Sequence, residues 1–231
     1  MIFEQLFDQK SSTYTYIIAS GEGREALIID PVIEHSDEYS TILKNLDLKL
    51  VKVIDTHIHA DHISALNELN KRTNCIRVMG EKSKSEVIDL RIKDGEKINV
   101  EEVELQAIYT PGHTDCSYSF LMNDRVFTGD TLLINGSGRT DFQNGNAYDA
   151  YDSIFNKLLK LPEKTFVFPA HDYNGKKFST IENEKNNNPR LQVSSKEEYS
   201  EIMNNLNIAN PKMMDVAVPA NVKGLTLDNI N

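Results

Sequence analysis

Three of the six histidines in this chain lie within residues 56–62, whose sequence is THIHADH. They are His57, His59 and His62, and Asp61 stands beside them. Neutral imidazoles and carboxylates are ligands that first-row metals such as iron and zinc take up. The spacing therefore predicts a metal site. The open questions are which metal binds, how many ions bind and which reaction they support.

Three more candidate ligands stand where predicted strands end. His113 lies in a Thr-Pro-Gly-His-Thr turn, Asp130 in a Gly-Asp-Thr step, and His171 in a Pro-Ala-His-Asp-Tyr segment. Strand ends on one edge of a sheet can converge, so we expect these residues to meet the 56–62 segment. His35 lies outside the pattern, and we expect it to be an ordinary surface histidine.

A purely structural zinc site is the alternative for this cluster. Structural zinc prefers closed, cysteine-rich tetrahedra. The two cysteines of the chain, Cys75 and Cys116, lie far apart and form no CxxC pair. The histidines and aspartates therefore favour a site with open coordination positions. We expect both cysteines to be buried, reduced thiols.

Short runs of β-branched and aromatic residues precede the candidate ligands. Runs of this kind, bounded by Gly, Pro and Asp, favour strands over helices. They occur at residues 13–19, 26–29, 50–54, 102–109, 117–122, 125–128 and 165–168. Asp94-Gly95 is a further turn signal, and Asn123-Asp124 predicts a hairpin.

Apolar spacing predicts helices between these strands. They are expected over residues 36–46, just after the histidine cluster, over 151–159, and from Ser195, which has capping-box spacing to Glu198. Two β-rich halves, each followed by helices, indicate a sandwich of two sheets covered on its outer faces. We see no linker, so we expect a single domain over residues 1–231.

The composition of the chain indicates which kinds of molecule the protein can bind. The formal net charge is −10, which opposes nucleic-acid binding because phosphate affinity depends on Lys and Arg. No apolar run approaches the ~20 residues needed to cross a bilayer. Neither a secretory n-region nor an Arg-rich transit sequence is evident. We therefore expect a cytoplasmic protein that binds neither nucleic acid nor membrane.

The motifs H-x-H-x-D-H, G-H-T and G-D, together with a late histidine, resemble those of the metallo-β-lactamase superfamily. The resemblance extends over nearly the whole chain. It implies an α+β fold, the four-layer αβ/βα sandwich of the metallo-β-lactamase type, with the metal at one edge of the two sheets.

Three downstream strings resemble the persulfide dioxygenases of this superfamily. They are GRTDFQ at residues 138–143, HDYNG at 171–175 and PKMMDVAVPAN at 211–221. The family implies a sulfur dioxygenase of sulfide detoxification with one non-haem Fe(II) per chain. Such an enzyme oxidises glutathione persulfide, or a similar thiol persulfide, with O₂ to sulfite and thiol.

The resemblance implies that His57, His113 and Asp130 bind the iron. Two histidines and one carboxylate leave adjacent positions open for O₂ and the substrate sulfur. Arg139 and Tyr173 would be catalytic and substrate-binding residues. Arg139 would offer a planar fork to a glutathione carboxylate, and Tyr173 a phenol beside the iron. Without the resemblance, Arg139 could equally pair with Asp141, and Tyr173 could be an ordinary core or rim tyrosine.

Four residues remain: His59, Asp61, His62 and His171. In a persulfide dioxygenase they would hydrogen-bond around the iron ligands. In the related glyoxalase II hydrolases they would help to bind two zinc or mixed ions, with Asp130 bridging and a hydroxide attacking a thioester. The ligand set alone leaves both readings open, and the downstream strings favour the dioxygenase.

Two further expectations concern the surroundings of the site. Family members often carry a cysteine where this chain has Ser137, so any role of a thiol there is absent. The chain ends soon after the PKMMDVAVPAN string, so we expect a separate sulfurtransferase, or a small molecule, to supply the persulfide. Family members are often dimers, which makes a homodimer the expectation here.

Overall fold

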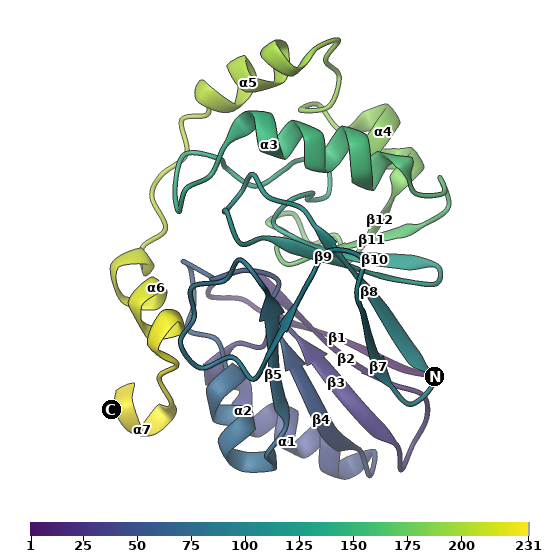
Figure 1. Cartoon of the computed structure of the whole chain (residues 1–231), viewed down its shortest axis with the longest axis vertical. Coiled ribbons are helices and arrows are strands. Elements are labelled where there is room, and N and C mark those ends of the chain that lie inside the picture. The colour runs from purple at the N-terminus through teal and green to yellow at the C-terminus, as the bar shows by residue number, and fades with distance from the viewer. Residues whose placement is uncertain (231) are drawn as a thin grey trace.

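The computed structural model describes residues 1–230 and contains two six-stranded sheets packed face to face, with helices on both outer faces (Figure 1). This arrangement confirms the expected α+β sandwich of four layers. Within residues 1–230, no helix combines the length and apolar character that crossing a membrane requires.

The first sheet is mixed. Its strands β1 to β3 are antiparallel and β3 to β6 are parallel, in the order β1-β2-β3-β4-β5-β6. The bounds are β1 Ile2–Asp8, β2 Thr13–Ala19, β3 Glu25–Ile29, β4 Lys49–Ile54, β5 Ile76–Gly80 and β6 Leu90–Ile92. Every residue of β2 is buried, because this strand is covered on both faces.

The second sheet has the order β12-β11-β10-β9-β8-β7. Its bounds are β7 Lys97–Val100, β8 Val103–Tyr109, β9 Tyr118–Met122, β10 Arg125–Gly129, β11 Phe166–Pro169 and β12 Ser179–Thr180. Strands β8 and β10 are each antiparallel to β9, and β10 is parallel to β11. Strands β8, β10 and β11 therefore run in one direction and end at one edge of the sheet.

Helices cover both sheets. Helices α1 (Ser36–Asn45), α2 (Leu66–Thr73), α6 (Met214–Lys223) and α7 (Leu227–Ile230) lie on the side of the first sheet. Helices α3 (Ala147–Tyr151), α4 (Ile181–Asn187) and α5 (Lys196–Asn204) cover the second. Each helix buries the side that faces its sheet and exposes a polar outer side. In α1, for example, Tyr39 and Leu43 are buried.

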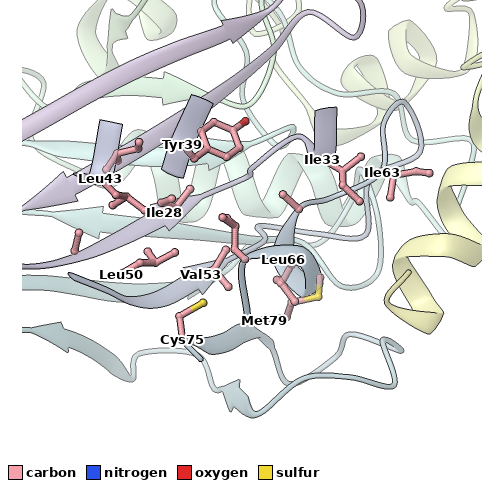
Figure 2. Packing of buried hydrophobic residues seen from close by; sticks show 14 of the residues in the cluster. Ile28, Ile33, Tyr39, Leu43, Leu50, Val53, Ile63, Leu66, Cys75 and Met79 are labelled. Atoms are coloured by element: carbon pink, nitrogen blue, oxygen red, sulfur yellow. The ribbon is translucent and has the colours of Figure 1, made fainter. Parts of the chain in front are cut away.

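The alternation of side chains along the strands divides the core into layers. Ile17 and Ile28 face the helices of the first sheet, where Figure 2 shows Ile28 beside Tyr39 and Leu43. Their neighbours Ile18 and Leu27 face the second sheet instead. Successive residues of a strand point to opposite faces, so a strand rich in Ile and Leu supplies two apolar layers at once.

Most predicted elements are confirmed, and one differs. The predicted turn at Asp94-Gly95 is present, and it joins β6 of one sheet to β7 of the other. Residues 151–159 do not form one regular α-helix: α3 ends at Tyr151 and continues as a π-helical turn over Asp152–Lys157. The side chain of Ser153, in that turn, donates to the Pro111 carbonyl at 2.6 Å.

His35, which we expected to be an ordinary surface histidine, is partly buried and pairs with two acidic residues. Its Nε2 lies 2.9 Å from Asp8 Oδ1, and its Nδ1 lies 2.9 Å from Glu38 Oε2. Burial alone would lower the pKa of His35, but the hydrogen bonds and charges of Asp8 and Glu38 outweigh it and raise the pKa above the ordinary histidine value. The charged imidazole therefore ties the end of β1 to the start of α1.

This pairing makes stability depend on pH. Because the folded-state pKa of His35 is raised, its contribution is fully present below the ordinary histidine pKa of ~6.5. It is lost as pH rises through the raised value. We expect His35→Gln to lower the free energy of unfolding by at most about 1 kcal/mol at pH 6, and by less at pH 9. Urea unfolding of both proteins at the two pH values measures this, and an equal difference at both would contradict it.

Candidate metal centre

The predicted ligands meet at one edge of the sandwich. The 56–62 loop follows β4, His113 follows β8, Asp130 follows β10, and His171 follows β11. The ring centroid of His57 lies 4.2 Å from that of His59 and 5.0 Å from that of His113. The parallel directions of β8, β10 and β11 bring these strand ends together, as the sequence led us to expect.

Close contact between the two sheets sets the spacing at this edge. The Thr56 carbonyl of the first sheet accepts from the Tyr118 N–H of the second at 2.9 Å. Gly129, in the left-handed region with φ +52°, passes so close to Thr56 that a Cβ on it would lie 2.7 Å from Thr56 Oγ1. A side chain there would push Asp130 away from the histidine loop, which explains the glycine of the Gly-Asp step.

His57, His113 and Asp130 form one group of possible metal ligands, with a ligand atom of each within 4.8 Å of the others. His113 Nδ1 donates to the Arg139 carbonyl at 2.8 Å, so it is Nε2 that faces the other candidate ligands. That Nε2 lies 3.5 Å from Asp130 Oδ2. Two imidazoles and a carboxylate converging in this way fit a two-histidine, one-carboxylate metal site.

The orientation of His57 is fixed by its other ring nitrogen. The Thr56 hydroxyl donates to Asp30 Oδ2 at 3.0 Å and therefore accepts from His57 Nδ1, also at 3.0 Å. Nε2 of His57 is then the unprotonated atom. Burial and the neighbouring imidazoles hold the pKa of His57 well below the ordinary value, so the ring is neutral, as a metal ligand must be.

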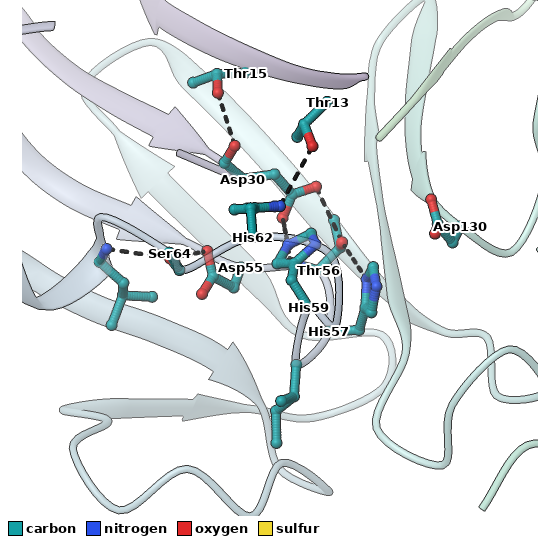
Figure 3. Close-up of polar contacts among 12 residues, drawn as sticks. Thr13, Thr15, Asp30, Asp55, Thr56, His57, His59, His62, Ser64 and Asp130 are labelled. Atoms are coloured by element: carbon teal, nitrogen blue, oxygen red, sulfur yellow. Dashed lines mark hydrogen bonds and ion pairs between the residues drawn. The ribbon is translucent and has the colours of Figure 1, made fainter. Parts of the chain in front are cut away.

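Asp30 is a central residue that the motifs do not contain (Figure 3). Besides the Thr56 hydroxyl, its carboxylate accepts the Thr56 N–H at 2.7 Å and pairs with His59 Nε2 at 3.1 Å. Its side chain is buried and its backbone is left-handed, with φ +50°. This conformation is costly for a residue other than glycine. Asp30 directly follows β3 and precedes Pro31, and nothing in this local sequence indicates its contacts with residues 56–59.

The second group of possible ligands is His59, Asp61 and His62. His59 Nδ1 and His62 Nε2 are buried and have no hydrogen-bond partner within residues 1–230. Burial opposes the charge on His59, but Asp30 outweighs it and raises the pKa of His59 to about 9. Buried polar atoms normally have partners, so these two nitrogens favour a bound water, substrate or ion at this place. An ion would require His59 to lose the proton on Nδ1.

His171 lies between two carboxylates. Its Nδ1 is 2.6 Å from Asp130 Oδ1, and its Nε2 is 2.9 Å from Asp61 Oδ2. Burial would lower the pKa of His171, but Asp130 and Asp61 outweigh it and hold the pKa well above the ordinary value. The ring is therefore an imidazolium that donates to both acids.

The two residues predicted to bind substrate, Arg139 and Tyr173, have different surroundings. The Arg139 guanidinium forms a two-point pair with Asp141 at 2.7 and 2.8 Å and donates to the Ala209 carbonyl at 2.8 Å. The N–H groups that could bind a substrate carboxylate are therefore already paired within the protein. Tyr173 is 70% exposed, and its ring lies parallel to that of His171 with centroids 6.2 Å apart, which places it at the rim of the site.

Ser137 is buried, and its side chain contacts the helical layer rather than the candidate ligands. Its hydroxyl lies 3.1 Å from the Tyr199 hydroxyl of α5, and it also contacts Met203 Sδ. A residue here packs between the Gly-Arg-Thr loop and the helical layer. Both cysteines are also buried and free.

Comparison with known proteins agrees with this geometry. The family model of the metallo-beta-lactamase superfamily matches residues 9–89 and 80–171. The mitochondrial persulfide dioxygenase ETHE1 of Mus musculus is 42% identical over 96% of this chain and 88% of its own length. The crystal structure of ETHE1 from Myxococcus xanthus superposes with a TM-score of 0.94 at 48% identity, covering 96% of this chain and 98% of that one. A hydroxyacylglutathione hydrolase of Dictyostelium discoideum is 29% identical over 75% of the chain and 68% of its own length.

The contacts of Asp30 predict a large effect on stability. Asp30→Ala leaves the Thr56 N–H, the Thr56 hydroxyl and His59 Nε2 without their buried acceptor. We expect the free energy of unfolding of the metal-free protein to fall by about 3 kcal/mol, measured by urea unfolding with circular dichroism. Asp37→Ala is the control, because Asp37 is an exposed acid paired with Arg72 and its loss should cost less than about 1 kcal/mol. Equal effects in the two variants would contradict a special role for Asp30.

Proposed function

Because the chain belongs to the metallo-β-lactamase superfamily and, within it, to the persulfide dioxygenases, we propose that it uses one Fe(II) ion bound by His57, His113 and Asp130. The proposed substrate is glutathione persulfide or a similar thiol persulfide, which O₂ and water convert to sulfite, thiol and protons. The observation that carries the proposal is the convergence of these three residues at the edge of the sandwich, in a chain similar to persulfide dioxygenases over nearly its whole length.

The donor set suits this chemistry. Two imidazoles and one carboxylate occupy one face of an ion and leave other positions for O₂ and the persulfide sulfur. Bound Fe(II) would supply the redox step between O₂ and the outer sulfur, which zinc could not because it has no redox chemistry. The protein fixes the ligands beforehand: Arg139 and Thr56 each accept from a ring nitrogen and leave the opposite nitrogen free.

The position of His171 supports a single ion. Its two nitrogens both donate to carboxylates, so neither is free to bind metal. Asp61 Oδ2 accepts from His171 and also from His62 Nδ1 at 2.9 Å. In the proposed enzyme His171 holds Asp130 Oδ1 by a hydrogen bond and thereby presents Oδ2 to the ion. Asp61, His59 and His62 hydrogen-bond around the iron ligands.

We assign the substrate side of the site to Arg139 and Tyr173. The Arg139 side chain is paired with Asp141 and lies 4.1 Å from the centroid of the Phe142 ring. For Arg139 to bind a substrate carboxylate, that carboxylate must replace Asp141 on the guanidinium fork. Tyr173, exposed beside His171, offers its hydroxyl to the substrate as it enters.

One observation favours a second candidate, the glyoxalase II type of hydroxyacylglutathione hydrolase. His59 Nδ1 and His62 Nε2 are unpartnered within residues 1–230, and with Asp61 they could hold a second ion. Two ions would activate a bridging hydroxide for attack on a thioester. This requires the contact between His171 and Asp61 to break, which is why the single-ion reading is preferred.

The wider setting is also part of the proposal. We place the enzyme in the cytoplasm, as a homodimer supplied with persulfide by a separate sulfurtransferase. Reduced, buried Cys75 and Cys116 are consistent with that compartment, and the net charge of −10 opposes a nucleic-acid partner.

The first test is metal content and oxygen consumption. After anaerobic reconstitution with Fe(II), we expect near one iron per chain and O₂ uptake with glutathione persulfide. Asp130→Ala should lose iron and O₂ uptake together, because it removes the single carboxylate of the ligand set. Asp115→Ala removes an exposed acid that contacts Lys84 and Asn144, and should leave both readouts unchanged.

Two results would contradict the proposal. One is hydrolysis of S-lactoylglutathione without O₂ uptake, together with two bound ions per chain, which would establish the hydrolase. The other is O₂ uptake by Asp130→Ala at the wild-type rate.

A second test separates the two roles of Arg139. If its fork binds substrate, Arg139→Ala should raise KM about tenfold, the equivalent of ~1.4 kcal/mol, with a smaller change in kcat. Asp141→Asn frees the fork and should leave KM unchanged or lower. If Arg139 serves only the pair with Asp141, both variants should change the kinetics in the same direction. The two KM values measured side by side decide between these roles.

A further inference from the structure

Asn221 joins the C-terminal helix to the candidate metal loop. It is the last residue of the PKMMDVAVPAN string and lies in α6. Its Nδ2 donates to the His59 carbonyl at 2.9 Å and to the His62 carbonyl at 3.0 Å. Its Oδ1 accepts the Ser64 N–H at 2.8 Å. The side-chain amide thus makes three hydrogen bonds, all to the backbone of residues 59–64.

We propose that Asn221 is a positioning residue that holds the 56–64 loop in the conformation that binds metal. The inference rests on the proposed role of His57 as a metal ligand. Asn221 does not touch the ligand atoms themselves. It acts through the backbone that carries His57, His59 and His62.

The loop needs such a partner because it lies between β4 and α2 and is not regular in structure. Buried backbone carbonyls and N–H groups must find partners outside a helix or sheet ladder. Gln143 Nε2 supplies one of them, donating to the Ile58 carbonyl at 2.8 Å. Asn221 supplies the partners for the second half of the loop, so the ligand segment is held from both sides.

The helix that carries Asn221 is itself fixed by other contacts. The Val222 carbonyl accepts the Glu86 N–H at 2.8 Å, and the Ser85 hydroxyl lies 3.2 Å from the Asn221 carbonyl. Gly224 ends the helix with φ +69°, and a Cβ there would lie 2.5 Å from Val87 Cγ2. Asn67 Nδ2 donates to the Gly224 carbonyl. Removing only the Asn221 side chain should therefore leave α6 docked.

The experiment measures metal binding directly, without relying on turnover. Co(II) is titrated into the metal-free full-length protein, and its visible absorption reports affinity and ligand geometry. We expect Asn221→Ala to bind Co(II) about tenfold more weakly than wild type and to change the absorption bands. Asn67→Ala is the matched control, because it loses a hydrogen bond to α6 without touching the loop. It should keep wild-type affinity and bands.

Asn221→Asp provides a second variant, in case the alanine substitution prevents folding. Aspartate has the same size and keeps the acceptor for the Ser64 N–H, but it places an oxygen against the His59 and His62 carbonyls. Its added negative charge alone would strengthen cation binding. Weaker Co(II) binding by Asn221→Asp would therefore support positioning of the loop.

The outcomes separate this inference from the proposed function. Folded Asn221 variants with wild-type Co(II) affinity and absorption would overturn the positioning role. Equal weakening in Asn221→Ala and Asn67→Ala would do the same, because loosening of α6 would then explain it. Failure of the wild-type protein to bind Co(II), or binding that survives His57→Ala, would instead contradict the proposed metal site.

Discussion

The site depends on the burial of many polar groups in one small volume. Five imidazoles and the carboxylates of Asp30, Asp61 and Asp130 meet where the two sheets end, and His57, His59, His62 and His171 are each at most 4% exposed. Unpaired charges or polar atoms at such a depth cost several kcal/mol each. Every nitrogen and oxygen there must therefore find a hydrogen bond, an opposite charge or a ligand. This requirement decides which group each histidine of the site faces.

The groups around the ligands satisfy that requirement in two different ways. On the side of His57 and His113, a hydroxyl and a backbone carbonyl accept from Nδ1, so each ring turns its Nε2 toward the site. On the side of His171, two carboxylates take both nitrogens, so the ring is charged. The same residue type is thus a candidate ligand on one side and a cation on the other. The difference comes from the hydrogen-bond partners of each ring, not from the sequence motif that contains the histidine.

Because the role of each histidine depends on its partners in the folded structure, the sequence could predict only part of the site. The strands, the two-sheet sandwich and the convergence of the ligands follow from local apolar patterns and from histidines at strand ends. Asp30 and Asn221 do not, because their partners in the 56–64 loop are far away in sequence and no local pattern marks the contact. The pairing of Arg139 with Asp141 was one of two equal readings, since both residues stand in one short loop. The Asp94-Gly95 turn was recognised, but no local signal says that it leads from one sheet to the other.

The same contacts connect the substrate side of the site to the metal side. The Arg139 carbonyl orients His113, while the guanidinium of the same residue pairs with Asp141 and donates to the Ala209 carbonyl, between α5 and α6. A substrate carboxylate that displaced Asp141 would therefore act on a loop whose backbone holds a proposed iron ligand. On the opposite side, α6 reaches the histidine loop through Asn221. The segment of the chain from α5 to α6 thus contacts both halves of the candidate ligand set. This gives a physical reason for the C-terminal PKMMDVAVPAN string to accompany the candidate metal site.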